Sequence, residues 1–135
     1  MDSKNSLPLV SIITIVSNNV KTIRNSIQSV AYQDYENIEH ILIDNCSNDG
    51  TLEAIYENKE EISLIISEPD NGIYYALNKG IQLSNGKIIG FLNSDDVLKS
   101  RVTISMIVSE LDSSDAEAVY GDLQYFARER PNTIT

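Results

Sequence analysis

The most constraining feature of the chain is a nearly continuous run of β-branched and apolar residues at positions 9–16, LVSIITIV. Such a run is typical of a strand that is buried on both faces, as strands of a parallel sheet are. Shorter apolar runs follow at residues 38–43, 62–66, 87–92 and 118–120. The chain is therefore expected to build a sheet that is covered on both sides.

Segments with helical spacing of apolar residues separate these runs. In residues 21–32, for example, Ile23, Ile27 and Val30 recur on one face with polar residues between them. Strands that alternate with helices predict an α/β layered, Rossmann-like domain with a mainly parallel central sheet flanked by helices. Right-handed crossovers then place the strand-to-helix loops at one edge of the sheet, where such folds bind ligands. The other expected helices span residues 51–57, 73–84 and 101–111.

Length and charge limit the classes of protein that the chain can belong to. Its 135 residues predict a single domain, residues 1–135, and ten basic against twenty acidic side chains give a formal charge of -10. This charge argues against nucleic acid as a partner, because binding to its phosphates needs clustered Lys and Arg. One cysteine, Cys46, excludes an intrachain disulfide and a cysteine-based zinc site. Residues 1–7 lack the pattern of a signal peptide and no apolar run could cross a bilayer, so we expect a cytoplasmic protein without a transmembrane segment.

Aspartates follow two of the expected strands. Asp44 comes directly after the second strand, Asp49 lies five residues further on, and Asp95 and Asp96 follow the fourth. Carboxylates that gather at one edge repel one another, and a divalent cation that prefers oxygen ligands would neutralise them. The alternative is that these residues only form turns and helix caps. No glycine follows the first strand, so a dinucleotide fingerprint and a phosphate-binding P-loop are both absent.

Five ordered segments of the chain resemble a known family. They are PLVSIITIVSNN, SIQSVAYQDYENIEHILIDNCSNDGT, SEPDNGIYYALNKGI, GKIIGFLNSDDVL and VYGDL, which lie between residues 8 and about 126. Together they resemble the family 2 glycosyltransferases with a GT-A fold, and most of all the bacterial enzymes of capsule and exopolysaccharide synthesis. The resemblance implies an inverting transfer of a sugar from a metal-bound nucleotide-diphosphate sugar, a UDP-sugar in the first instance, to a polysaccharide or lipid-linked acceptor. A location at the inner membrane face, as a peripheral protein, is compatible with that role.

The family's motifs imply roles for particular residues of this chain. The DxD motif maps to residues 93–95, so Asp95 would bind Mn²⁺ or Mg²⁺ and Ser94 would lie near the ribose. Asp44 would bind the base, and Lys79 would contact the diphosphate, although a solvated helix lysine is an equally good interpretation. The segment that frames the uracil base corresponds to Thr14, Ile15, Val16 and Ser17.

The chain also departs from the family pattern. Ser17 stands where an aromatic residue often stacks on the base, and Asn45, Leu77 and Asn93 replace an aspartate, an arginine and the first aspartate of DxD. These changes weaken nucleotide contacts, and they put the identity of the nucleotide in doubt. Asp44 and Asp95 are kept.

The catalytic base is not assigned. In this family it lies in the acceptor-binding half, downstream of residue 135, and Asp122 in the YGD segment is more suited to shaping the cleft. The chain is thus expected to be a donor-binding part, with a non-catalytic binding or assembly module as the alternative. A receiver domain is excluded because the acidic pair that it needs after the first strand is replaced by residues 17–19, SNN. Self-association through a sheet edge near residues 118–127 is a further expectation.

Other candidate groups are given structural interpretations. His40, the one histidine, lies upstream of the ligand-bearing end of its strand, which favours a packed side chain. Cys46 has no histidine placed to activate it as a nucleophile. Packing is the expected role of Tyr74 and Tyr75, with a contact of one of them to the donor as the alternative.

Overall fold

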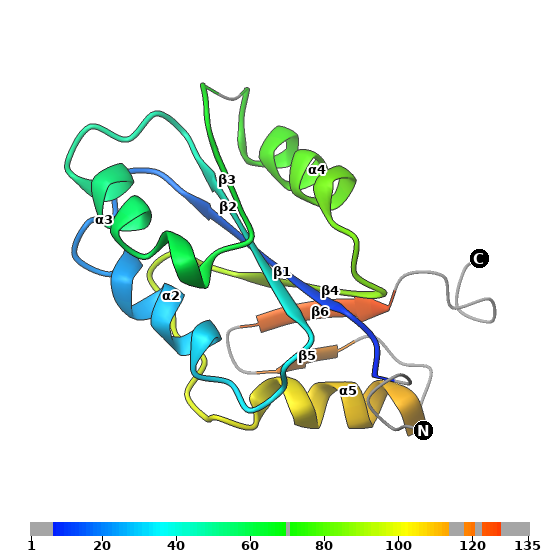
Figure 1. The fold of residues 1–135 in the computed structure, drawn as a ribbon. Helices are drawn as coiled ribbons and strands as arrows, with labels where there is room; N and C mark the ends of the chain where they lie inside the picture. The colour runs from blue at the N-terminus through cyan, green and yellow to red at the C-terminus, as the bar shows by residue number, and fades with distance from the viewer. Residues whose placement is uncertain (1–6, 70, 114–117, 121–122, 128–135) are drawn as a thin grey trace.

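The computed structural model of the chain describes residues 7–69, 71–113, 118–120 and 123–127, with side chains described up to residue 111. Strands and helices alternate along the chain, and the helices lie on both faces of one sheet (Figure 1). The strands are β1 (Val10–Val16), β2 (Ile38–Asp44), β3 (Leu64–Ser67), β4 (Ile88–Leu92), β5 (Ala118–Tyr120) and β6 (Leu123–Ala127). The helices are α2 (Ile23–Ala31), α3 (Thr51–Glu57), the short 3₁₀ helix η1 (Lys59–Glu61), α4 (Ile73–Leu83) and α5 (Thr103–Ser113).

The sheet has the strand order β3-β2-β1-β4-β6-β5. The first four strands in that order are parallel, and β6 pairs antiparallel with both β4 and β5. The predicted α/β layered fold with a mainly parallel sheet is therefore confirmed. Strand β6 was not predicted; two residues separate it from β5, and so short a connection can join only antiparallel neighbours. Strand β3 starts at Leu64, two residues later than predicted, because η1 occupies the chain just before it.

The core lies on both faces of the sheet. Helix α4 covers one face, and α2, α3 and α5 cover the other (Figure 1). On the α4 side, Ile13, Ile41 and Ile43 of β1 and β2 pack against Ala76. On the opposite side, Ile23 and Ile27 of α2 pack with neighbouring strand and α3 residues, and burial of these apolar side chains stabilises that face.

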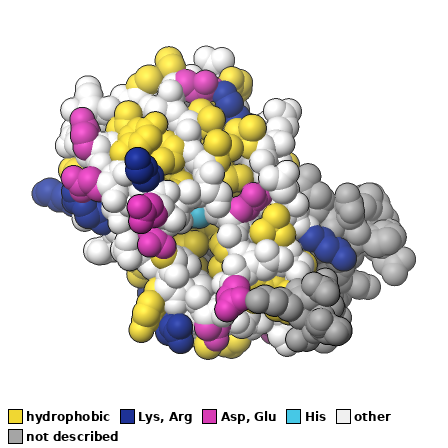
Figure 2. Space-filling model, viewed as in Figure 1, with side chains coloured by type: hydrophobic (Ala, Val, Ile, Leu, Met, Phe, Trp, Pro, Cys, Tyr) yellow, Lys and Arg dark blue, Asp and Glu magenta, His cyan; other side chains and the backbone are white. Residues whose placement is uncertain are grey.

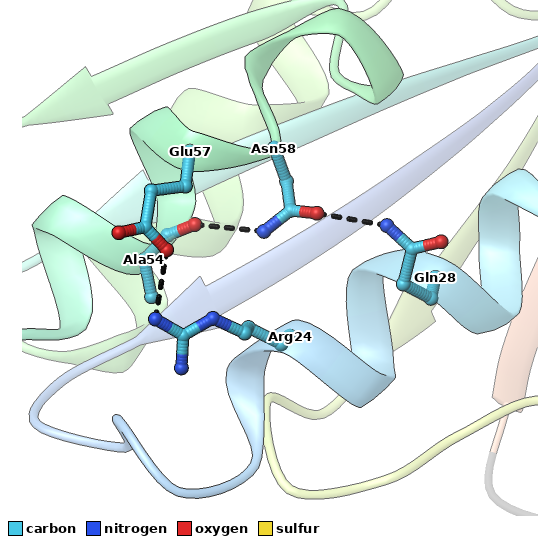
Figure 3. Close-up of polar contacts among 5 residues, drawn as sticks. All are labelled: Arg24, Gln28, Ala54, Glu57 and Asn58. Carbon is cyan, nitrogen blue, oxygen red and sulfur yellow. Dashed lines mark hydrogen bonds and ion pairs between the residues drawn. The ribbon is translucent and has the colours of Figure 1, made fainter.

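Polar contacts join α2 to α3 above this apolar layer (Figure 3). The Arg24 guanidinium lies 2.8 Å from the Glu57 carboxylate, and Gln28 Nε2 donates to Asn58 Oδ1 at 2.8 Å. Asn58 Nδ2 in turn donates to the carbonyl of Ala54 at 2.9 Å, at the end of α3. The ion pair is more than half exposed on both sides, so it adds little free energy and mainly fixes the helix orientation.

No helix in the described part of the chain is long and apolar enough to span a bilayer.

A buried polar pair lies between the apolar clusters under α2. Thr14 Oγ1 of β1 and His40 Nε2 of β2 are 2.9 Å apart, and both side chains are almost fully buried. Burial lowers the pKa of His40 from 6.5 to about 3, because the charged imidazolium is poorly solvated there. The prediction of a packed histidine is confirmed, and the ring is neutral in the folded protein.

Acid should therefore destabilise the fold through His40. Below pH 6.5 the His40 ring binds a proton in the unfolded chain but not in the folded chain, so the free energy of unfolding falls as the pH decreases. We expect the free energy of unfolding to be about 1.4 kcal/mol lower at pH 5.5 than at pH 8 from this group alone. Urea titrations across pH 5–8 measure this slope. In His40→Gln the slope should flatten; an equally steep slope in the variant would assign the acid sensitivity to other groups.

Helix α4 approaches the sheet closely at Gly80. A Cβ atom at this position would lie 2.7 Å from Ile13 Cγ2 and 3.2 Å from Ile43 Cδ1. Both isoleucines belong to the buried cluster of this face, so they have little room to move. Glycine is thus required by the distance between helix and sheet.

Gly80→Ala tests this close approach. The substitution gains about 1 kcal/mol in helix propensity, yet we expect a net destabilisation of about 1–3 kcal/mol because the core must open. Asn78→Ala, at an exposed position of the same helix, is the matched control and should be neutral or stabilising. Thermal unfolding of both variants would measure the difference. A Gly80→Ala protein as stable as Asn78→Ala would contradict the packing argument.

Candidate functional site

Three loops meet at the carboxyl edge of the parallel strands. They follow β1, β2 and β4 and span residues 17–22, 45–50 and 93–97. The pairing of Val16 with Asp44 brings the ends of β1 and β2 to the same level, so the first two loops leave the sheet side by side. This edge is where ligands bind in open α/β sheets.

Reciprocal hydrogen bonds connect the first two loops. The backbone N–H of Asn18 donates to Ser47 Oγ at 2.8 Å, and the backbone N–H of Asn48 donates to Asn18 Oδ1 at 2.9 Å. Asn18 and Cys46 have φ angles of 54° and 49°, in the left-handed region. Asn tolerates this conformation better than most residues, and the side chain of Asn18 is used here to accept a hydrogen bond from the second loop.

Asn19 connects all three loops. Its backbone N–H donates to Thr51 Oγ1 at 2.8 Å, at the start of α3, and its carbonyl accepts from the N–H of Ile23 at 3.0 Å, at the start of α2. Its side-chain Nδ2 donates to Ser94 Oγ in the loop after β4. The hydroxyl of Thr22 adds a bond to the Ser94 carbonyl at 3.0 Å. Ser94 is thus buried and hydrogen-bonded to the loop after β1. Its predicted contact with a ribose stays a prediction.

Asp44 is fully buried and holds the second loop. Its carboxylate accepts from the Ser47 N–H at 3.0 Å, from the Ser47 hydroxyl, and from Ser67 Oγ at 2.8 Å. These bonds satisfy both carboxylate oxygens and shape the turn that follows β2. A base contact for Asp44 stays a prediction, and the structural role is the one that the contacts support directly.

The other aspartates are satisfied separately. Asp49 accepts from the N–H and hydroxyl of Thr51 and from the Val20 N–H, and the bond from the Thr51 hydroxyl is the main cause of a lowered pKa of Asp49. Asp96 accepts from Asn93 Nδ2 at 3.2 Å. Within the described residues no three His, Cys, Asp or Glu side chains come together as a metal site. The expectation that these carboxylates share one cation stays a prediction; Asp44, Asp49 and Asp96 each accept hydrogen bonds from neighbouring groups.

Asp95 differs from these neighbours. Its side chain is exposed, and in the described part of the chain it makes no hydrogen bond or ion pair. It directly follows the buried Ser94, so the loop that carries it is fixed while its carboxylate faces solvent. Of the aspartates at this edge, Asp95 is the exposed one whose carboxylate makes no contact within the described residues.

The other residues predicted to contact the nucleotide sugar differ in their exposure and in their partners. Thr14 and Val16 are buried within the sheet, Ile15 is half-buried on the opposite face, and Ser17 is exposed at the end of β1. Lys79 forms an ion pair with Glu68, and its Nζ lies 5.7 Å from the centre of the Tyr75 ring. Tyr74 and Tyr75 are exposed, so the expectation that they pack is wrong: Ala76 is the residue of this turn that faces the core. Asp122 lies outside the described residues.

Sequence reasoning missed the amide and hydroxyl groups that hold the loops together, above all Asn18, Asn19 and Ser47. The signal that could have identified them is the Asn-Asn pair directly after a buried strand, since Asn favours left-handed turns and helix N-termini.

Comparison of the sequence with known proteins identifies its family. The model of glycosyl transferase family 2 matches residues 11–134, which is nearly the whole chain. The chain belongs to this family. It is 37% identical over 95 residues to TuaG of Bacillus subtilis, a glycosyltransferase whose name assigns it provisionally to teichuronic acid biosynthesis. That match covers 68% of this chain and 38% of TuaG.

Solved glycosyltransferase structures share the fold. The mannosyltransferase PcManGT of Pyrobaculum calidifontis, in complex with GDP-Man and Mn²⁺, superposes with a TM-score of 0.80 at 22% identity, covering 90% of this chain and 45% of that one. Staphylococcus aureus TarS 1-349, in complex with UDP-GlcNAc, gives 0.73 at 23% identity, with 81% and 32% covered. The predicted GT-A fold is thus confirmed, and the chain spans less than half the length of each of these proteins.

Variants of Asn18 should separate backbone strain from loop contacts. Asn18→Gly keeps easy access to the left-handed conformation but loses the bond to Asn48, and we expect it to be about 0.5–1 kcal/mol less stable than the native protein. Asn18→Ala loses the bond and also strains the backbone, and should cost about 1 kcal/mol more than Asn18→Gly. Chemical denaturation gives both differences. Equal stability of the Gly and Ala variants would show that the loop relaxes out of the left-handed conformation.

Proposed function

We propose that this chain is the donor-binding part of a glycosyltransferase that uses a nucleotide-diphosphate sugar together with a divalent cation. The observation that carries the proposal is the exposed carboxylate of Asp95, which has no partner among the described residues, on a loop that is fixed at the carboxyl edge of the sheet. Membership of the family supports it, as do the nucleotide sugars bound by PcManGT and TarS.

The donor set at Asp95 suits Mn²⁺ or Mg²⁺. Such a cation takes oxygen ligands, and it is often held by one or two carboxylates together with substrate phosphates and waters. A single free carboxylate beside a nucleotide diphosphate therefore suffices, and a cluster of three protein ligands is not needed. When bound, the cation neutralises the diphosphate and assists departure of the nucleotide.

The chain's own residues would orient the donor. We assign the base to the edge formed by Ser17 and the loop that Asp44 holds, with UDP as the preferred nucleotide. The hydrogen bond between Asn19 and Ser94 holds the loop that carries Asp95. Lys79 would have to leave its ion pair with Glu68 before it could contact the diphosphate. We therefore expect Lys79 to contribute less to donor binding than Asp95 does.

The acceptor side is proposed from the family alone. A saccharide or lipid-linked acceptor, an inverting reaction and a base supplied downstream of residue 135 fit a chain that covers 38% of TuaG. Sugar transfer to such acceptors would take place in the cytoplasm, at the inner face of the membrane. The second candidate is a module that binds nucleotide sugars without turning them over.

Calorimetric titration of UDP with and without Mn²⁺ tests donor binding. Mn²⁺ should strengthen UDP binding, and Asp95→Asn should weaken the Mn²⁺-dependent binding by about tenfold or more, because the cation loses its protein ligand. Asp96→Asn, which removes the same charge from the neighbouring residue, is the matched control and should retain binding. Identical affinities for the native protein and Asp95→Asn would reject Asp95 as the metal ligand.

Turnover separates the two candidates. Hydrolysis of a UDP-sugar by a chain that binds UDP with Mn²⁺ would identify an enzyme, and binding without hydrolysis or transfer would identify the module. GDP in place of UDP tests the assignment of the nucleotide.

A further inference from the structure

A second concavity lies at the other end of β2, away from the three loops. It is a cavity of about 360 Å³ between the end of α2, the start of β2 and the segment around η1. Figure 2 shows the chain's one histidine, in cyan, at the bottom of a hollow with acidic side chains around it. Its lining includes His40, Glu60 and Glu61.

The charge of this lining has one sign. Glu60 and Glu61 belong to this lining, and none of the described lining residues is Lys or Arg. Glu60 and Glu61 are exposed at the rim on η1. A hollow lined in this way focuses a negative potential and attracts a cation.

His40 supplies a second observation that is independent of the carboxylates. It is 2% exposed, its Nε2 pairs with Thr14, and its Nδ1 is buried without a hydrogen-bond partner. An unsatisfied buried polar atom is uncommon, and it calls for a water or a ligand. When the neutral ring donates from Nε2 to Thr14 Oγ1, Nδ1 becomes an acceptor for an N–H group.

The protein geometry favours an organic cation over a chelated metal. No three His, Cys, Asp or Glu side chains of the described residues come together as a metal site, here or elsewhere. An alkylammonium group needs no such cluster, because it carries its own N–H donors and spreads its contacts. A volume of about 360 Å³ is also in the range of small-molecule sites.

We propose that this cavity binds a small organic ammonium ion, such as a diamine, with one N–H group directed to His40 Nδ1 and the charge balanced by Glu60 and Glu61. The site is separate from the proposed donor site, so it stands or falls independently of the proposed function. Its ligand is a cation, whereas the nucleotide sugar is an anion.

Calorimetric titration with putrescine at low ionic strength is the first test, with uncharged 1,4-butanediol as the matched control ligand. Putrescine should bind and butanediol should not. Glu60→Gln combined with Glu61→Gln should weaken putrescine binding about five- to tenfold. Glu53→Gln combined with Glu110→Gln removes two charges from exposed positions on α3 and α5, and should leave the affinity within about twofold.

Nitrogen NMR of the ring provides the second test. Because the chain has one histidine, its two ring nitrogen signals belong to His40 without further assignment. Putrescine should shift the Nδ1 signal more than the Nε2 signal, which already reports the bond to Thr14. This readout needs no variant that risks unfolding the protein.

Three results would overturn the proposal. They are no putrescine binding at low salt, equal weakening in the two double variants, and an Nδ1 signal that does not move at saturating putrescine. Equal weakening would indicate general attraction to a protein of charge -10. UDP titrations of the same samples report the donor site, so a failure at either site is recognised separately.

Discussion

The in-register pairing of β1 with β2 is the constraint on which the rest of the edge depends. It aligns Val16 with Asp44, so the two loops that follow begin at the same height and within reach of each other's backbone. Asn18 then bonds to Ser47 and Asn48 of the second loop, and Asn19 reaches across to Ser94. The loops are thereby fixed before any ligand arrives, which is the condition for a polar site that does not reorganise on binding.

This edge is organised by neutral groups more than by charge. The acidic side chains in it are mostly engaged by hydroxyls and amides, as Asp44 is by Ser47 and Ser67. Although the chain carries a net charge of -10, no three of the described acidic side chains come together as a metal site at this edge. Asp95 is the exception, and its isolation makes its carboxylate more informative about a ligand than the number of aspartates nearby.

The layered architecture was predictable because burial on two faces leaves a clear pattern of apolar runs separated by amphipathic segments. The family could also be identified, because the order of five segments carries more information than any single motif. Residue roles were harder to predict. Sequence position puts Asp44 and Asp95 at the same edge, but hydrogen bonding decides that one is buried and the other exposed. Strand β6 was missed because periodicity alone gives neither its partner nor its direction.

The two left-handed residues, Asn18 and Cys46, have a consequence for how the loops can vary in sequence. Asn18 and Cys46 each lie two positions beyond the paired ends of β1 and β2, so both strands leave the sheet through the same kind of bend. Since the bends are bonded to each other, neither loop can change length or shape alone. Substitutions tolerated in one loop should depend on the residue present in the other, and second-site suppressors of a damaged loop are to be sought in its neighbour. The two loops, 28 residues apart in sequence between Asn18 and Cys46, would then vary as one unit.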